Sequence, residues 1–284
     1  MVESVLSLHP RQFAVLGNPI QHSLSPVIHE HFARQFGHAI SYSRQLLDRD
    51  SFAKYVREFF ADGGGGLNVT VPFKLLAHDC ADWLHESAEL AAAANTLRFS
   101  RNGVEAWNTD GAGLVNDLTG RCGQDIAAKK ILILGAGGAA RGIIGPLLDS
   151  GPASLTIVNR THSKATQLID RTAVKYSEVE LRALSERDLV DAAGPFDLII
   201  NSTSLGIDGG EVNIPPDIAV SAFCYDLSYG RTAAFAQWAR QAGAMGVSDG
   251  LGMLVEQAAL SYEIWLGVKP ETNEVYKFLS EQLV

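Results

Sequence analysis

The chain has 284 residues, of which 46% are hydrophobic, and a formal net charge of −9 at pH 7. This length and apolar fraction are typical of one large or two ordinary globular domains with a sizeable core. No apolar run approaches the roughly 20 residues that a bilayer crossing needs. Met1–Arg11 lacks the basic end and apolar block of a secretion signal, so we expect a cytoplasmic protein without a membrane partner. The acidic balance, without a Lys/Arg cluster, also argues against a nucleic-acid partner.

The three cysteines, Cys80, Cys122 and Cys224, are far apart in the sequence. An odd number without a CxxC pair or a Cys/His ligand pattern predicts neither a disulfide framework nor a metal site. We therefore expect buried, apolar thiols and no bound metal.

An α/β pattern occupies the first part of the chain, where short apolar runs predict strands and longer periodic runs predict helices. The predicted strands are 12–16, 39–46 and 66–71, and the predicted helices are 26–36 and 52–60. The glycine run 63–66 is short enough to be a helix exit and turn, so we do not take it as a linker.

A second α/β pattern begins at Lys129, where a short apolar run ends at a glycine cluster and an Ala-rich helical stretch follows. Further strands are predicted at 154–158, 196–200 and 222–227, and helices at 164–176 and 181–192. Alternating strands and helices indicate a parallel, doubly wound sheet. The helical stretch 251–266 follows this unit, which suggests that the chain returns to its first domain.

The glycine cluster has the character of a dinucleotide-binding turn. It reads Gly135-Ala136-Gly137-Gly138-Ala139, and Ala140 takes the place of the third small residue in GxGxxA variants. Small residues there allow backbone N–H groups and a helix N-terminus to approach a pyrophosphate closely. A strand-to-helix turn without a ligand is the alternative that the motif alone leaves open.

The end of the next predicted strand favours NADP over NAD. Val158 ends that strand about twenty residues after the glycines, where NAD enzymes commonly place Asp or Glu on the ribose hydroxyls. The chain instead has Asn159, Arg160, Thr161 and Lys164. Arg160 can pair with a 2′-phosphate and stack on adenine, while Thr161 and Lys164 can add donors. A solvated arginine is the ordinary alternative, and the glycine turn before it makes NADP the prediction.

Four polar strings stand at predicted element ends in the first part of the chain. They are Ser23-Leu24-Ser25-Pro26, Asn68-Val69-Thr70-Val71-Pro72-Phe73-Lys74, Ala94-Asn95-Thr96-Leu97 and Asn108-Thr109-Asp110-Gly111. Their hydroxyls and amides would suit a polyhydroxylated ligand, and Ser23 and Ser25 could hold a carboxylate. Each string also has an ordinary explanation, such as a helix N-cap at Ser25 or Asp110, or plain strand positions in the string at 68–71.

Taken together and in this order, the strings resemble the shikimate dehydrogenase family. The resemblance runs from Leu16-Gly17-Asn18-Pro19-Ile20 through the four strings and the glycine turn to Asp249–Gln257, which is nearly the whole chain. Several separated motifs make it more specific than one glycine fingerprint. It implies reversible reduction of 3-dehydroshikimate to shikimate with NADPH, in the biosynthesis of aromatic amino acids.

The resemblance also implies which residues form the site. The catalytic pair would be Lys74 and Asp110. The substrate ligands would be this pair with Ser23, Ser25, Tyr229, Thr70, Asn95 and Gln257, the two serines and the tyrosine holding the carboxylate. The nicotinamide pocket would contain Leu227, Gly250 and Met253, and the string Asn201–Gly206, which includes Thr203, would lie beside the cofactor. Glu86 falls where a cofactor-contacting acid is sometimes assigned, and a solvated helix acid is equally plausible there.

The chemistry of a lysine agrees with the role that the resemblance implies for Lys74. Hydride addition to a ketone builds negative charge on its oxygen, so a cation that also donates a proton lowers the barrier. With the Asp110 carboxylate nearby, the two groups should take up and release the proton as a coupled pair. An ordinary surface lysine that opens a helix is the alternative.

The predicted organisation is two α/β domains. Residues 1–110 would form an N-terminal substrate-binding domain to which 250–284 return, and residues 111–249 a Rossmann-type, doubly wound NADP-binding domain. The active site would lie in the cleft between them. Monomer and homodimer both remain open.

One departure from the family pattern and two alternatives bear on this prediction. After Tyr229 the family usually has a proline-containing loop, whereas Gly230-Arg231-Thr232 is shorter and lacks proline, so we expect a differently shaped loop beside the cofactor. A quinate/shikimate dehydrogenase that uses NAD is one alternative, and the Arg160-Thr161 pair without an acid argues against it. A nucleotide-binding relative without turnover is the other, and Lys74 with Asp110 argues against it because binding alone needs no acid/base pair.

Overall fold

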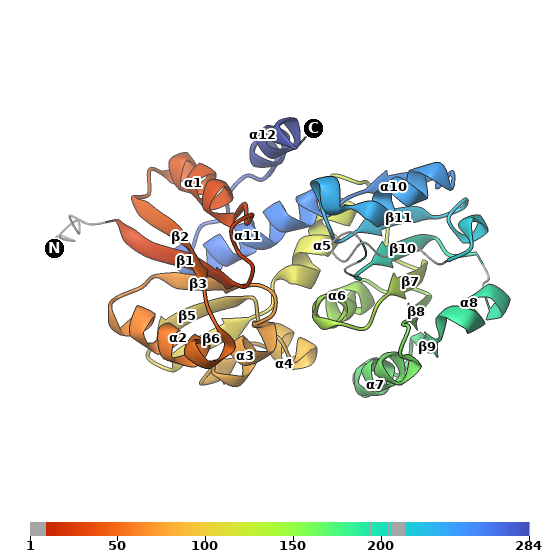
Figure 1. The fold of residues 1–284 in the computed structure, drawn as a ribbon, viewed down its shortest axis with the longest axis horizontal. Coiled ribbons are helices and arrows are strands. Elements are labelled where there is room, and N and C mark those ends of the chain that lie inside the picture. The colour runs from red at the N-terminus through yellow and green to blue at the C-terminus, as the bar shows by residue number, and fades with distance from the viewer. Residues whose placement is uncertain (1–9, 193–194, 204, 206–213, 284) are drawn as a thin grey trace. The chain divides into compact units, whose positions relative to one another are not determined.

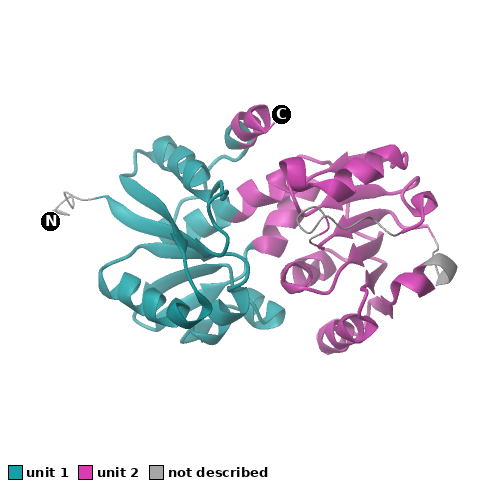
Figure 2. Ribbon diagram, viewed as in Figure 1, with its two compact units in different colours: residues 1–109, 258–275 teal, residues 110–257, 276–284 magenta. Residues whose placement is uncertain are grey.

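The computed structural model describes residues 10–192, 195–203, 205 and 214–283. The chain folds into two compact units (Figure 2). The first unit comprises residues 1–109 and 258–275, and the second comprises residues 110–257 and 276–284. Both are α/β, as the sequence predicts.

A six-stranded mixed sheet forms the centre of the first unit (Figure 1). Its strands are β1 (Arg11–Gly17), β2 (Ile40–Leu46), β3 (Gly66–Val69), β4 (Trp83–Leu84), β5 (Thr96–Ser100) and β6 (Gly103–Trp107). They lie in the order β2-β1-β3-β5-β6-β4. β1 is parallel to both of its neighbours, β5 is antiparallel to β3 and β6, and β4 is parallel to β6.

Helices cover both faces of this sheet, because β1 is apolar on both sides. The helices of the first unit are α1 (Ser25–Phe36), α2 (Phe52–Ala61), α3 (Lys74–Asp79), α4 (Glu86–Ala91) and part of α11 (Leu251–Leu266), with the short turn η1 (Arg49–Ser51) before α2. Ala14 and Leu16 pack with the apolar face of α2, whereas Phe13 and Val15 point the other way and pack with Trp265 of α11. In Figure 1 α1 and α2 lie on opposite sides of the sheet.

The second unit is a doubly wound parallel sheet. Its strands are β7 (Lys130–Leu134), β8 (Ser154–Val158), β9 (Glu180–Leu184), β10 (Leu198–Asn201), β11 (Phe223–Asp226) and β12 (Gly246–Ser248). All neighbouring pairs are parallel, and the order β12-β11-β10-β7-β8-β9 places the reversal of winding between β7 and β10. That order is the one found in Rossmann-type folds, which confirms the predicted fold class.

Helices also cover both faces of the second sheet. They are α5 (Asp110–Thr119), α6 (Gly138–Asp149), α7 (His162–Ala173), α8 (Glu186–Ala192) and α10 (Ala234–Gln241), with short turns η2 (Pro216–Ile218) and η3 (Gly230–Thr232). The last helix, α12 (Asn273–Gln282), begins in the first unit and continues in the second. Ile131 and Ile133 of β7 pack with α5, α6 and α7, whereas Leu132 and Leu134 pack with α8 and α10. The alternation explains why β7 reads as a continuous apolar run.

One predicted element is wrong. Residues 181–192 do not form a single helix, because β9 occupies the first part and α8 begins only at Glu186. Leu181 and Ala183 pack against the core with a two-residue period, and β9 pairs in parallel with β8. Ser185 and Asp188 exchange hydrogen bonds between their side chains and backbone N–H groups, which is a helix start inside the predicted helix.

The cysteines differ in burial from one another. All three are free, and Cys224 is buried as expected, but Cys80 and Cys122 are only half-buried. Among the described residues, no group of His, Cys, Asp and Glu side chains could hold a metal ion. Within the same residues, no helix has the length and apolarity that a membrane crossing requires.

Candidate active site

The register of the first sheet brings four loops to one of its edges. Leu16 near the end of β1 pairs with Val69 at the end of β3. Thr96, which begins β5, pairs with Asn68 on one side and with Trp107, the last residue of β6, on the other. The segments that follow β1, β3 and β6 and the residue that precedes β5 therefore meet at the same edge. These segments contain Ser23, Ser25, Thr70, Lys74 and Asn95.

Lys74 is held by the turn that follows β3. The Phe73 N–H donates to the Thr70 carbonyl at 2.9 Å, and the buried Phe73 ring packs 5.3 Å from that of Phe52. The Lys74 carbonyl accepts the Ala94 N–H at 2.8 Å, which ties this turn to the residue before Asn95. Lys74 begins α3 and is half-buried. Its backbone is thus fixed at two points, next to Thr70 and Asn95.

The two serines of the loop after β1 are hydrogen-bonded to each other. Ser23 Oγ donates to Ser25 Oγ at 3.2 Å and accepts the Ser25 N–H at 3.3 Å. Leu24 occupies the N-cap position of α1, so the ordinary N-cap explanation for Ser25 is wrong. The Arg44 Nε–H donates to the Ser23 carbonyl at 2.8 Å and holds the loop against β2.

Asn95 is oriented by buried polar neighbours. Its Nδ2 donates to Thr109 Oγ1 at 2.9 Å, and its Oδ1 accepts the Thr109 N–H at 2.9 Å. Asn68, also buried, donates to the Asn95 carbonyl at 3.2 Å and to Ser261 Oγ at 2.9 Å, and it accepts the Tyr42 hydroxyl at 2.7 Å. Buried amides are stable only with such partners, so this network fixes the edge where Asn95 lies.

The other predicted substrate residues belong to the second unit. Asp110 is buried and is the first residue of α5, directly after Thr109. Gln257 lies in α11, where its Nε2 donates to the Leu254 carbonyl at 2.8 Å. Tyr229 is half-buried and precedes the turn η3. Glu86, by contrast, belongs to the first unit and is exposed in the first turn of α4, where a negative charge favours the helix in any case.

The carboxyl ends of β7 and β10 carry the predicted cofactor residues. Gly135 follows β7, and Ser202 and Thr203 follow β10, so both segments lie where the winding reverses. Ligands of open α/β sheets bind at this switch point. Thr203 donates through its N–H and its hydroxyl to Asn201 Oδ1, at 3.1 and 2.6 Å. Ser204 and Gly206 of the same predicted string lie outside the described residues.

The glycine turn fits a dinucleotide. Gly135 has φ +100°, and a Cβ there would lie 2.8 Å from Ser202 Oγ, so the protein itself requires this glycine. A Cβ on Gly137 or Gly138 would meet no atom within 4 Å, so the packing of the protein does not require these two. Gly137 is the N-cap of the 12-residue helix α6 and brings no capping side chain, and the first turn has no acid. Small residues and open N–H donors at a helix start suit a pyrophosphate.

The residues after β8 leave positive charge exposed. Arg160, Thr161 and Lys164 are all exposed, and within the described chain neither cation forms an ion pair. The Asn159 side chain makes two hydrogen bonds nearby. Its Oδ1 accepts the Ala136 N–H at 3.1 Å, and its Nδ2 donates to the Thr161 carbonyl at 2.9 Å. Asn159 therefore joins the glycine turn to the segment with the cations, which fits a nucleotide that carries a 2′-phosphate.

Leu227 and Gly250 are packed against each other. A Cβ on Gly250 would lie 2.2 Å from the Leu227 carbonyl oxygen, so only glycine allows this approach. The Gly250 N–H donates to the Ser228 carbonyl at 2.9 Å. Asp226, which the sequence did not single out, anchors this loop: it accepts the Asn201 side-chain amide at 3.0 Å and the Ser228 N–H at 3.1 Å. Burial raises the pKa of Asp226, and these donors oppose that shift.

The fold and the site define a two-domain α/β protein of the nucleotide-dependent dehydrogenase class. Three family models match it: the shikimate dehydrogenase substrate binding domain at residues 15–97, shikimate / quinate 5-dehydrogenase at 117–206, and the shikimate 5′-dehydrogenase C-terminal domain at 250–277. The chain belongs to the shikimate dehydrogenase family.

Individual relatives agree over nearly the whole chain. Shikimate dehydrogenase (NADP(+)) of Vibrio cholerae is 47% identical over 277 residues, which are 96% of each protein. The crystal structure of an Ael1 enzyme from Pseudomonas putida is 38% identical, with a TM-score of 0.87 over 95% of this chain and 98% of that one. Shikimate 5-dehydrogenase from Thermus thermophilus, in complex with NADP(H) and shikimate, is 25% identical, with a TM-score of 0.82 over 96% of this chain and 100% of that one.

Proposed function

We propose that the protein is an NADP-dependent shikimate dehydrogenase that interconverts 3-dehydroshikimate and shikimate in the biosynthesis of aromatic amino acids. The observation that carries this proposal is the 47% identity to an NADP-dependent shikimate dehydrogenase over 96% of both chains. Family membership over separated motifs agrees with the chemistry of the residues at the two sheet edges.

The two units have different tasks in this proposal. The first unit provides most of the substrate residues, since its sheet edge gathers hydroxyl and amide side chains that can read a polyhydroxylated ring, and the second unit adds Asp110, Tyr229 and Gln257. The second unit binds the nucleotide, since its switch point carries the glycine turn. The sequence-based domains, 1–110 with 250–284, and 111–249, which we retain as a proposal, differ from the compact units in that residues 250–257 and 276–284 belong to the second unit.

The nucleotide would be held by backbone donors and exposed cations. The residues assigned to it are Gly135, Ala136, Gly137, Gly138, Ala139, Asn159, Arg160, Thr161, Lys164, Thr203, Leu227, Gly250 and Met253. The N–H groups of the glycine turn would bind the pyrophosphate, and Arg160 and Lys164 the 2′-phosphate. When bound, NADPH supplies the hydride for reduction of the ketone.

The catalytic roles belong to Lys74 and Asp110. The Lys74 ammonium stabilises the negative charge that develops on the carbonyl oxygen and donates a proton to it. Asp110 accepts the hydrogen bond of a ring hydroxyl. In the direction of shikimate oxidation, the same residues remove the proton from the substrate hydroxyl.

The remaining side chains orient the ring. Ser23, Ser25 and Tyr229 bind the substrate carboxylate through their hydroxyls, and Thr70, Asn95 and Gln257 bind ring hydroxyls. The hydrogen bond between the two serines holds them as one unit. Positioning of this kind accounts for much of the rate of an enzyme that reacts at a single ring carbon.

The decisive experiment is an absorbance assay at the NADPH band with 3-dehydroshikimate. We expect oxidation of NADPH with 3-dehydroshikimate and formation of NADPH with shikimate. The assay is repeated with quinate and with NAD, because a quinate/shikimate dehydrogenase is the competing function. An NAD preference would contradict the cofactor proposal, and the lack of turnover with both 3-dehydroshikimate and shikimate would contradict the function.

The cytoplasm is the compartment that we propose. Three free cysteines agree with a reducing compartment. Fractionation of cells with an antibody against the protein would test this location. Oligomeric state is open between monomer and homodimer, and sedimentation of the purified chain would decide it.

A further inference from the structure

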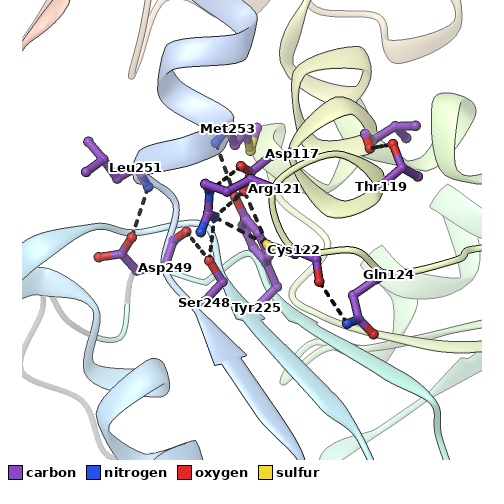
Figure 3. A network of polar contacts seen from close by, with 11 residues as sticks. Asp117, Thr119, Arg121, Cys122, Gln124, Tyr225, Ser248, Asp249, Leu251 and Met253 are labelled. Carbon is purple, nitrogen blue, oxygen red and sulfur yellow. Dashed lines mark hydrogen bonds and ion pairs between the residues drawn. The ribbon is translucent and has the colours of Figure 1, made fainter. Parts of the chain in front are cut away.

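A cluster of polar side chains lies at the start of α11 in the second unit (Figure 3). We call it the Asp117 cluster, and it comprises Asp117 of α5, Arg121 just after α5, and Tyr225 of β11. Asp117 is 2% exposed and Tyr225 is 0% exposed. None of the three belongs to the residues assigned to substrate or nucleotide.

Both oxygens of the Asp117 carboxylate accept hydrogen bonds. Arg121 donates through Nε to Asp117 Oδ1 at 2.7 Å and through Nη2 to Oδ2 at 2.6 Å. The Tyr225 hydroxyl donates to Asp117 Oδ2 at 2.7 Å. Burial first, and the neighbouring Asp117 charge second, raise the pKa of Tyr225 well above its ordinary value, so the phenol keeps its proton.

The oxygen of Tyr225 also accepts a hydrogen bond from α11. The Met253 N–H donates to it at 3.2 Å, and the Leu251 N–H donates to Asp249 Oδ1 at 3.1 Å. The first N–H groups of any helix have no partner within the helix. Tyr225 and Asp249 therefore satisfy two of these donors in the first turn of α11, as Figure 3 shows.

Gly252 lets the carboxylate approach the helix. A Cβ at this position would lie 2.0 Å from Asp117 Oδ1 and 2.4 Å from Oδ2, so no other residue fits while Asp117 stays in place. A negative charge at the N-terminus of a helix is favourable. Arg121 closes the cluster on its other side, where Nη2 donates to Ser248 Oγ at 2.8 Å and the guanidinium lies 4.4 Å from the Tyr276 ring centre.

One residue fixed in this way, Met253, is assigned to the nicotinamide, and Gly250, also assigned to it, directly precedes α11. Met253 is hydrogen-bonded directly to the tyrosine. We propose that Tyr225, backed by Asp117 and Arg121, is a positioning residue that sets the first turn of α11 against the nicotinamide half of the nucleotide. The inference rests on the proposed function for the identity of the ligand. Asp117 is buried, but the Arg121 side chain is 27% exposed, and an ion pair that solvent reaches contributes little to stability, so a gain in stability alone does not explain the cluster.

The test is Tyr225→Phe, which keeps the buried ring and removes only the hydroxyl. Affinity is measured by titration with NADPH and with 2′,5′-ADP, which lacks the nicotinamide. We expect about a two- to tenfold loss of affinity for NADPH, the range for one lost hydrogen bond, and no loss for 2′,5′-ADP. We also expect kcat with 3-dehydroshikimate to fall, while KM for this substrate changes less. Arg121→Lys, which keeps the charge but loses the two-pronged contact, should show the same contrast more weakly.

Tyr176→Phe is the matched control. Its hydroxyl, in the same unit, donates to Asp149 Oδ1 at 2.8 Å, and its loss should leave both affinities at wild-type values. The positioning role would be overturned if both variants, Tyr225→Phe and Arg121→Lys, lost affinity for NADPH and for 2′,5′-ADP equally. It would also be overturned if neither variant lost affinity for NADPH. A wild-type protein that shows no turnover of 3-dehydroshikimate would overturn the proposed function instead. The contrast between the two nucleotides would then still support the positioning role.

Discussion

The side chain of Asn95 and the hydroxyl of Thr109 are hydrogen-bonded at 2.9 Å, although the two residues are 14 positions apart. The register of β5 and β6 makes this contact possible, because Thr96 and Trp107 are directly paired. A residue proposed to read a ring hydroxyl is thus oriented by the residue that immediately precedes Asp110.

Removal of the Thr109 hydroxyl should weaken substrate binding. Thr109→Val keeps the shape of the side chain and the backbone bond to Asn95 Oδ1, but it leaves Asn95 Nδ2 without this partner. We expect KM for shikimate to rise about three- to tenfold, the effect of one buried hydrogen bond. Thr109→Ser restores the hydroxyl and should restore KM. Steady-state kinetics of the two variants make the comparison, and equal KM values in both would contradict it.

Loss of the Lys74 ammonium should affect the chemical step. Lys74→Ala should lower kcat by a factor on the order of 10² to 10⁴, the usual contribution of general acid catalysis. Affinity for shikimate should change only modestly, because the interaction is made mainly in the transition state. Lys54→Ala, at an exposed position of α2, is the control. Unchanged ketone reduction in Lys74→Ala would show that another group donates the proton.

Alanine scanning of the glycine turn should separate folding from nucleotide binding. Gly137→Ala meets no protein atom within 4 Å, so thermal stability should stay at the wild-type value while affinity for NADPH falls. Gly135→Ala places a Cβ at φ +100° and against Ser202, so stability should fall by about 1–3 kcal/mol. Thermal unfolding and NADPH titration of both variants give the readouts. A destabilised Gly137→Ala with normal NADPH affinity would contradict the assigned role.

Removal of the positive charge of Arg160, which follows β8, should reduce the preference for NADP over NAD. Arg160→Ala should weaken NADP binding about tenfold or more, because a charged hydrogen bond contributes about 1.5–3 kcal/mol, and leave NAD binding unchanged. Lys175→Ala removes an exposed cation elsewhere in the same unit and controls for the overall charge. Equal changes in NADP and NAD affinity would exclude a 2′-phosphate contact.

Acid should destabilise the protein through His29. Burial lowers the pKa of His29 from 6.5 to about 3, and the hydrogen bond with Asn68 only partly opposes this. The unfolded state therefore takes up a proton below pH 6.5 that the folded state does not. The contribution of the neutral His29 ring to the free energy of unfolding is fully present above pH 6.5. It is lost as the pH falls toward 3, by up to about 1.4 kcal/mol per pH unit.

The variant His29→Phe should flatten this dependence. A phenyl ring can stack on Tyr42, whose ring centre is 4.5 Å from that of His29, but it cannot take up a proton. Urea unfolding between pH 7 and pH 4 should give a smaller slope than the wild type. His22→Gln, at an exposed position, should keep the wild-type slope. Equal slopes of the unfolding free energy against pH for the wild type and His29→Phe would exclude His29 as the cause of the acid destabilisation.

Local features of the fold were predictable from the sequence. The glycine turn, the residues after β8 and the polar strings each consist of consecutive residues at the end of an element, so a short stretch of sequence contains the whole pattern. The strand β9 was missed because Leu181 and Leu184, three residues apart, also fit a helical period. The serine and acid at positions 185 and 188, a helix start, could have divided it from α8. Gly103, with φ +87° after Asn102, similarly marks the hairpin of β5 and β6.

Contacts between distant residues were not predictable. Asn68 and Ser261 are 193 positions apart, and Tyr225 and Asp117 are 108 apart. Neither pair leaves a local pattern, since a serine or tyrosine in a buried element looks like any other until the sheets are assembled. The network around Asn95 and the Asp117 cluster therefore follow only from the folded chain.

The exposed cations after β8 separate the choice of coenzyme from the folding of the protein. Arg160 and Lys164 lie outside the apolar clusters of the second unit, and Val158, the last core residue before them, ends the strand. Surface substitutions at such positions usually change stability by less than about 0.5 kcal/mol. Descendants of this chain could therefore exchange one coenzyme for another through a few replacements on the outside of the molecule, with no compensating change in its interior.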